Sequence, residues 1–223
     1  MSKQHVALGA LFLGLAGCAT RIGYSGPGIV AGPQAGVVVL YSPAASPATS
    51  ERIGESLVAC VAGAITVELP GLQVVAVEDF AKAVFPGIEP ASIPVSRQSL
   101  APLVDDPQFL TRVTAAGVRY LITVEGRTTQ SPAEGGAIAG AAPGGGAILG
   151  FWIWERESTA AATVYDFEAH ETVGRVDVQV SGRPWFAVLG IFPLGAPSFT
   201  EGWACQKLGT ALAKFLRGRG VAS

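Results

Sequence analysis

The chain is poor in charge and in the side chains that carry metal or acid–base chemistry. Only 14% of its 223 residues are charged, and it has two histidines, three cysteines and one methionine. Beyond the first 17 residues His170 is the one remaining histidine, so a zinc site of the usual type is not expected. A formal net charge of -2 gives no basic surface, so we expect no nucleic-acid partner.

Motifs for catalysis are also missing. A serine triad would need His170 beside a nucleophile and an acid, and no strand-turn-helix serine motif accompanies it. The glycines of GGAIAG (135–140) are not followed by the Lys-Ser/Thr pair of a phosphate-binding loop. Asp105 and Asp106 precede a proline and a predicted helix, where carboxylates stabilise the positive helix end. We therefore expect no enzymatic activity, no metal site and no cofactor.

The first residues have the layout of a bacterial secretion signal. Lys3 provides a positive charge, and residues 6–15 form an apolar run that is too short to span a bilayer comfortably. The sequence LAGC at 15–18 resembles the bacterial lipobox, in which the signal is cleaved before a cysteine that becomes lipidated. This predicts a lipoprotein signal peptide at residues 1–17 and lipidation, including palmitate, at Cys18. The alternative is a buried N-terminal helix that happens to end in cysteine.

The residues after the lipobox predict where the protein resides. Ala19 follows the cysteine where aspartate is the usual signal for inner-membrane retention, so the resemblance implies outer-membrane delivery of a protein facing the periplasm. The acyl chains of such a lipoprotein anchor it without help from the folded part, so the membrane is a partner through the N-terminal lipid. Residues 18–35 are rich in Gly, Pro, Ser and Ala, which predicts a flexible tether.

Two cysteines remain once Cys18 is lipidated. Cys60 and Cys205 form an even pair in a compartment where disulfides persist. Each lies on or near the apolar face of a predicted helix, so a bond is reasonable if the two helices pack side by side. Closing so long a loop would stabilise the fold by roughly 4 kcal/mol in the entropic description. The alternative is a pair of buried free thiols.

Apolar periodicity and turn residues predict an α/β fold in residues 36–223. We expect one domain, with a mixed sheet of about five strands that has a parallel start, an antiparallel hairpin, and helices packed on it. In the hairpin, Val176, Val178 and Val180 alternate with polar residues, which predicts one wet face. The predicted strands are 36–41, 72–77, 118–128, 158–167 and 173–182, and the predicted helices are 46–68, 78–85, 106–116 and 201–216.

Two uncharged stretches, 135–154 and 184–200, interrupt this scaffold where ordinary surface loops would be polar. We interpret them as adjacent loops or hairpin extensions at one edge of the sheet that contact the membrane or another subunit. The alternative is that both stretches fold back into the core. The glycines of the candidate interface are Gly136, Gly140 and Gly144, and its aromatic residues are Phe151, Trp152, Trp154, Trp185, Phe186 and Phe192.

The segment TVYDFEAHETVGRVDVQVSG (163–182) resembles part of a known family. Bacterial envelope lipoproteins with a CsgG-like or TolB N-terminal-like α/β domain have a strand that ends in Asp, a turn with Thr and Gly, and a return strand. Asp166, Thr172 and Gly174 match that pattern, GVRYLITVEGRT (117–128) resembles the central strand, and a C-terminal amphipathic helix is likewise expected. The resemblance implies an α/β domain that acts either as an envelope scaffold or as an oligomeric pore.

The residues favour the scaffold. A pore would need strands of about 9 to 11 residues with alternating apolar and polar side chains, and GGAIAGAAPGGG (135–146) lacks that alternation. We therefore predict a lipid-anchored accessory or scaffold protein that binds another envelope protein or associates with itself. An outer-membrane channel-forming subunit of the CsgG-like kind is the first alternative, and an envelope hydrolase is the second.

Overall fold

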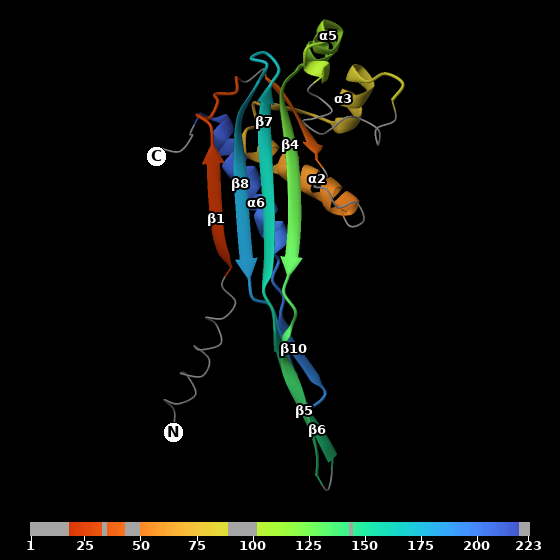
Figure 1. Cartoon of the computed structure of the whole chain (residues 1–223), viewed down its shortest axis with the longest axis vertical. Coiled ribbons are helices and arrows are strands. Elements are labelled where there is room, and N and C mark those ends of the chain that lie inside the picture. Colours follow the sequence, from red (N-terminus) through yellow and green to blue (C-terminus); the bar gives the residue numbers. More distant parts are fainter. Residues whose placement is uncertain (1–17, 33–34, 43–49, 89–101, 143–144, 219–223) are drawn as a thin grey trace. The chain divides into compact units, whose positions relative to one another are not determined.

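The computed structural model describes residues 18–32, 35–42, 50–88, 102–142 and 145–218. The predicted signal peptide and Gly144 lie outside these ranges. The described residues form a mixed α/β structure with two sheets (Figure 1). The first sheet has six strands in the order β1-β8-β7-β4-β2-β3, and the second has four in the order β10-β9-β6-β5.

The six-stranded sheet has the predicted parallel start. Its strands are β1 (Ala19–Ser25), β2 (Gly36–Tyr41), β3 (Gln73–Val75), β4 (Val118–Gln130), β7 (Arg156–Asp166) and β8 (Glu171–Gly182). β2 pairs in parallel with both β3 and β4. The fold class predicted from the sequence is therefore confirmed, although this sheet has six strands rather than about five.

Helices bury both faces of β2. Residues Val37 to Leu40 are all buried, although successive side chains of a strand point to opposite sides. Val38 and Leu40 belong to one core cluster with residues of α3 (Val77–Val84) and α5 (Pro107–Ala115). Helix α2 (Ser50–Glu68) also contacts β2, and Figure 1 shows α2 and α6 (Thr200–Leu216) behind the strands of the six-stranded sheet.

Local sequence signals explain the ends of α5. Asp106 caps its N-terminus, where one carboxylate oxygen accepts a hydrogen bond of 2.9 Å from the Gln108 amide. Pro107 is the first helical residue, a position that requires no amide hydrogen. Gly117 follows the helix with φ of 70°, the left-handed conformation that ends many helices. The predicted capping role of Asp106 is thus confirmed.

The antiparallel hairpin of β7 and β8 has the predicted alternation. Val176, Val178 and Val180 are buried, whereas Asp177 between them is exposed. Gly174 lies where the backbone has no room for a side chain, because a Cβ there would be 2.4 Å from both the Phe215 ring and the Ser25 carbonyl oxygen. The glycine that the family resemblance singled out is therefore explained by close packing.

The N-terminal segment departs from the prediction of a flexible tether at residues 18–35. Ala19–Ser25 is strand β1 and pairs with β8 at the end of the six-stranded sheet. The following residues are also held, since the amides of Ile29 and Ala31 donate hydrogen bonds of 3.0 and 2.9 Å to carbonyls at the end of α6. The tether prediction is wrong for these residues because backbone pairing, which composition does not reveal, orders an exposed polar segment.

The second sheet contains the two uncharged stretches. Its strands are β5 (Glu134–Ala142), β6 (Gly145–Ile153), β9 (Trp185–Leu189) and β10 (Phe192–Ala196). By its internal contacts the chain separates into two compact units, and this sheet belongs to the unit that includes residues 128–158 and 179–203. The stretches therefore form a sheet of their own, which the sequence did not predict.

Candidate functional site: an exposed apolar sheet

Two hairpins build the four-stranded sheet. β5 and β6 pair antiparallel over nine residues, and β9 and β10 pair antiparallel over five. Gly190, at φ of 67°, lies in the turn of the shorter hairpin, where a side chain would be strained. β6 also pairs with β9 and so joins the hairpins. The interpretation of the two stretches as adjacent hairpin extensions is confirmed in this respect.

The pairing register decides which side chains share a face. Directly opposed residues of an antiparallel sheet point to the same side, and successive residues point to opposite sides. Leu149 pairs with both Ile138 and Leu189, and Leu189 pairs with Phe192. One side, which we call the large-residue face, therefore carries Ile138, Leu149, Phe151, Ile153, Trp185, Leu189, Phe192 and Leu194.

This large-residue face is open to solvent. Ile138 is 72% exposed and Phe192 67% exposed, and Leu149, Phe151 and Leu194 are exposed as well. The alternative in which both stretches fold back as core is therefore wrong for these side chains. The aromatic side chains of this face contact one another instead: Phe151 stacks on Trp185, with the ring centroids 6.2 Å apart.

The opposite side, which we call the small-residue face, is built differently. Ala137, Ala139, Gly150 and Gly195 lie on it, together with Trp152, which pairs with Phe186 across the strands. The two aromatic rings lie 5.9 Å apart between centroids. Small residues surround Ile138 on β5, whereas β6 and β9 carry large apolar residues on both faces. Ile148 and Phe186, which belong to this second face by register, are also exposed.

The structure divides the predicted interface residues between the two faces. By register Gly136, Gly140, Phe151, Trp185 and Phe192 belong to the large-residue face, whereas Trp152 and Phe186 belong to the small-residue face. Trp154 lies just after β6, where its amide donates a hydrogen bond of 3.2 Å to the Pro184 carbonyl oxygen.

Four exposed apolar residues of the large-residue face are absent from the sequence prediction, which selected aromatic rings and glycines. They are Ile138, Leu149, Leu189 and Leu194, and all four are exposed. Ile138 lies two residues from Gly136 and from Gly140, and Leu149 lies two residues from Phe151. Because the residues on both faces of these strands are apolar, no sequence pattern separates the faces, and the register is needed to place Ile138 and Leu149.

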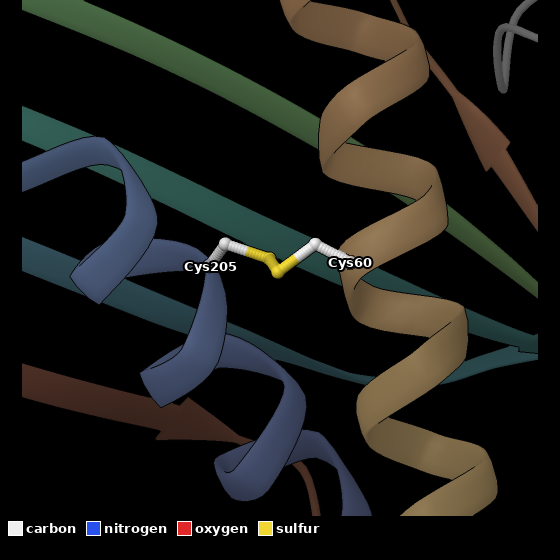
Figure 2. Close-up of a disulfide and its surroundings, with 2 residues drawn as sticks. All are labelled: Cys60 and Cys205. Carbon is white, nitrogen blue, oxygen red and sulfur yellow. A yellow bond between two sulfur atoms is a disulfide. The ribbon is translucent and has the colours of Figure 1, made fainter.

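Cys60 and Cys205 form a disulfide between α2 and α6, as Figure 2 shows. Their α-carbons are 6.3 Å apart. The two helices approach closely near this bond, because a Cβ on Gly209 would be 2.3 Å from the Ala64 side chain. The bond is thus formed where two helices pack side by side, and it closes a loop with a sequence separation of 145.

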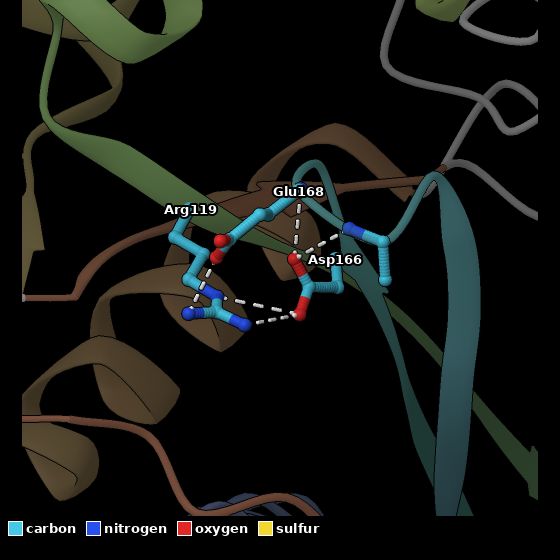
Figure 3. Close-up of polar contacts among 4 residues, drawn as sticks. Arg119, Asp166 and Glu168 are labelled. Carbon is cyan, nitrogen blue, oxygen red and sulfur yellow. Dashed lines mark hydrogen bonds and ion pairs between the residues drawn. The ribbon is translucent and has the colours of Figure 1, made fainter.

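Asp166, which the family resemblance singled out, is a structural residue in a polar cluster (Figure 3). One of its carboxylate oxygens accepts a hydrogen bond of 3.1 Å from Arg119 on β4, and the other accepts bonds from the amides of Glu168 and Ala169 in the turn after β7. Glu168 also forms an ion pair of 2.6 Å with Arg119. The hydrogen bond that Arg119 donates to Asp166 raises the pKa of Arg119. Both oxygens of Asp166 are occupied, so the cluster holds the hairpin on β4.

A polar concavity formed by described residues has no free cation for an anionic ligand. A pocket of about 680 Å³ is bordered by the turn after β1 and by the start of β8, with Arg175 on its wall. The Arg175 guanidinium pairs with Glu125 and, at 2.9 Å, with Asp177, so its charge is already neutralised. Burial by itself lowers the pKa of Arg175, but the hydrogen bonds that its guanidinium donates to Asp177 and Glu125 leave this pKa raised above its ordinary value.

The described ranges hold neither a metal-binding cluster nor a membrane-spanning helix. Within them, no group of three or more His, Cys, Asp and Glu residues is arranged to hold a metal ion. None of the helices described there combines the length and apolar character needed to span a membrane. The exposed apolar side chains of the four-stranded sheet make that sheet the candidate functional site.

Comparisons with known proteins give similarity at the level of solved structures. No protein-family model and no curated protein matches the chain. The PelC dodecamer from Paraburkholderia phytofirmans matches with a TM-score of 0.42 and 12% identity, over 92% of this chain and 100% of that chain. A variant of that PelC dodecamer matches with a TM-score of 0.39 and 10% identity, over the same shares of the two chains. A protein from Helicobacter pylori described as a homologue of neuraminyllactose-binding hemagglutinin matches with a TM-score of 0.33 and 6% identity. This match covers 86% of this chain and 85% of that chain. Such scores carry no argument about function, which has to be inferred from this chain's own residues.

Proposed function

We propose that the protein is a lipid-anchored accessory or scaffold protein of the bacterial envelope that binds another envelope component through the large-residue face. The observation that carries this proposal is the exposure of that face. Six of its apolar side chains, Ile138, Leu149, Phe151, Leu189, Phe192 and Leu194, are exposed on one side of one sheet.

Elementary energetics favours a partner for such a face. Keeping apolar surface in water costs about 25 cal/mol per Å², and monomeric soluble proteins rarely expose contiguous apolar patches above a few hundred Å². The strands also lack the charged residues that normally protect a solvated sheet, since 135–154 and 184–200 contain none. A partner for this face is therefore recognised by apolar contact and shape, with no ion pair from these stretches.

The proposed anchor is close in sequence to ordered structure. Cys18 is half-buried and directly precedes β1. An acyl chain on its sulfur would therefore be attached next to an ordered strand, with no long flexible segment between them. This supports a protein held close to the bilayer by its lipid, at the outer membrane and facing the periplasm.

Strand length favours the scaffold over the channel-forming subunit. A strand that crosses a bilayer needs about 9 to 11 residues. β5 and β6 have nine residues each, but β9 and β10 have only five. Half of the sheet is therefore too short to cross, whereas all four strands can cover an apolar surface.

Photo-crosslinking in intact cells tests the binding role. A photoreactive residue at Phe192 in the full-length chain is expected to give one discrete adduct with an envelope component, whereas the same probe at exposed Glu168 is not. A charge at a second position of the face, L149E, is expected to abolish the Phe192 adduct. If the adduct is unchanged in L149E, or equally strong from Glu168, the large-residue face is not the binding surface.

The anchor has its own test. We expect metabolic labelling with a palmitate analogue to modify the wild-type chain, and C18S to remain unlabelled and unprocessed. Labelling of C18S, or its processing without acylation, contradicts the predicted lipidation.

A further inference from the structure

One edge of the four-stranded sheet is unprotected. β5 pairs with β6 on one side and has no strand on its other side within the described chain. Natural proteins protect such edges with charged residues, proline or very short strands, because unpaired backbone groups recruit another strand. β5 has nine residues, no proline, and one charge, at its first residue Glu134. Its edge is therefore available for pairing.

The opposite edge of the same sheet is protected in two ways. β10 has only five residues, and the second of them is Pro193, which has no amide hydrogen to donate. A strand added beside β10 would gain few hydrogen bonds. The two edges therefore differ, and only β5 offers a long continuous row of backbone donors and acceptors.

The sequence of β5 is symmetric about its midpoint. Residues 136–140 read Gly-Ala-Ile-Ala-Gly in both directions, and Ile138 is the central residue of the nine in β5. We propose that β5 pairs antiparallel with β5 of a second copy of this chain, about a twofold axis at Ile138. An isologous contact of this kind is the arrangement of most homodimers.

This register suits both copies along the whole strand. Gly136 then faces Gly140 of the second copy, and Ile138 faces its own counterpart on the same side of the joined sheet. The only charged residue, Glu134, faces Ala142, so no like charges oppose each other. A shift of the register by two residues would leave residues of both strands without partners.

Two glycines of β5, Gly136 and Gly140, fit this contact and have no packing role among the described residues. No atom lies within 4 Å of the position that a Cβ would take on Gly136 or Gly140. Glycine weakens an isolated strand, and here nothing in the chain requires its small size. In the paired arrangement the glycines flank the two Ile138 side chains, so these isoleucines meet without competing neighbours.

The inference goes beyond the proposed function because it uses the edge of the sheet rather than its face. Edge pairing leaves Phe192 and Leu149 exposed, and it joins two four-stranded sheets into one. Loss of dimerisation would therefore leave the docking proposal standing, and loss of the Phe192 adduct would leave the dimer standing.

Cysteine crosslinking of the full-length chain, extracted in mild detergent, tests the register. Cys60 and Cys205 are bonded, so with Cys18 acylated an introduced thiol is the reactive one. I138C is expected to form a disulfide-linked dimer on mild oxidation. G136C alone and G140C alone are expected to give at most a tenth of that yield, since identical positions would be offset along the strands by four residues, about 14 Å at ~3.4 Å per residue. A mixture of G136C and G140C is expected to crosslink again.

A charge variant gives an independent measurement. I138K would place two ammonium groups opposite each other, and native mass spectrometry is expected to show a loss of the dimer. I191K carries the same charge change in the turn between β9 and β10 and is expected to remain dimeric. Circular dichroism confirms that each variant is folded.

Several results would overturn the proposal. Equal crosslinking of I138C, G136C and G140C would indicate random collision rather than a twofold register. Crosslinking of G136C to L194C in place of the I138C pair would indicate head-to-tail pairing of β5 with β10. The inference would also be wrong if the wild-type chain is monomeric in detergent and the I138C variant forms no disulfide-linked dimer.

Discussion

Neither strand β2 nor residues 135–153 of the β5–β6 hairpin carry a charged side chain, yet the two segments differ in burial. β2 is buried on both faces, between α2 on one side and the cluster with α3 and α5 on the other. The side chains of β5 and β6 that point to the large-residue face are exposed. The difference teaches that apolar composition makes a strand suitable for burial, whereas a second layer decides whether burial occurs within the chain.

The two regions also differ in what holds them together. The six-stranded sheet is accompanied by a disulfide between α2 and α6 and by the Arg119–Asp166 pair. The four-stranded sheet has its backbone pairing, its aromatic pairs and an exposed ion pair of 2.7 Å between Arg183 and Glu155. Substitutions in the six-stranded sheet should therefore lower the stability of the fold. Substitutions on the four-stranded sheet should mainly weaken its association with a partner.

The largest expected effect is loss of the disulfide. C60A/C205A should lower the free energy of unfolding by about 4 to 5 kcal/mol, because the closed loop is long and its restriction of the unfolded chain is lost. Urea unfolding measures this. Reduced wild type provides the control and should match the double variant. Equal stability of the oxidised wild type and the variant would contradict the prediction.

A matched pair of isoleucines compares the two regions directly. I122A removes a fully buried side chain of β4 and should cost about 2 to 5 kcal/mol in transfer and cavity energy. I191A, in the exposed turn between β9 and β10, should change stability by no more than about 0.5 kcal/mol. Unfolding midpoints of the two variants measure the contrast. Similar losses for both would mean that the four-stranded sheet has a buried core of its own.

Asp166 should contribute to stability rather than to activity. D166A leaves two turn amides without their acceptor and removes one of the two carboxylate partners of Arg119, which should cost about 1 to 3 kcal/mol. E168Q removes one charge of the neighbouring exposed ion pair and should have an effect of at most about 1 kcal/mol. Thermal unfolding of both variants separates these roles. A larger loss in E168Q than in D166A would reverse the assignment.

The smallest effect on stability is expected on the large-residue face. F192E should change the free energy of unfolding by no more than about 0.5 kcal/mol, because Phe192 is mostly exposed. The same change should abolish capture of the envelope component, measured with the photoreactive residue moved to Leu149. Strong destabilisation by F192E would show that this side chain supports the fold.

Local patterns predicted the elements of the six-stranded sheet well. The strand at 36–41 is β2, the helix ending at Glu68 is α2, and Asp106 and Gly117 mark the ends of α5 as expected. These signals are local because apolar periodicity, caps and turns depend on neighbours in sequence. The β1 segment lacked such a signal, since its order comes from pairing with β8.

The candidate site was predicted in part. The sequence identified the two uncharged stretches and aromatic residues such as Trp152 and Phe186, but it missed the register that places them on opposite faces from Phe151 and Phe192. Register depends on hydrogen bonds between segments that are distant in sequence, and a shift of one residue moves every side chain to the other face. Ile138 could be recognised only after that register was known.

The sequence by itself determined that the strands form, where the helices end, and that two long stretches carry no charge, because these properties depend on each residue and its near neighbours. The tertiary structure decided that Cys60 meets Cys205, that β1 joins the first sheet, and that the uncharged strands stay uncovered. Burial is a property of layers brought together in space, so apolar residues of the same kinds become core in β2 and an exposed surface in the four-stranded sheet.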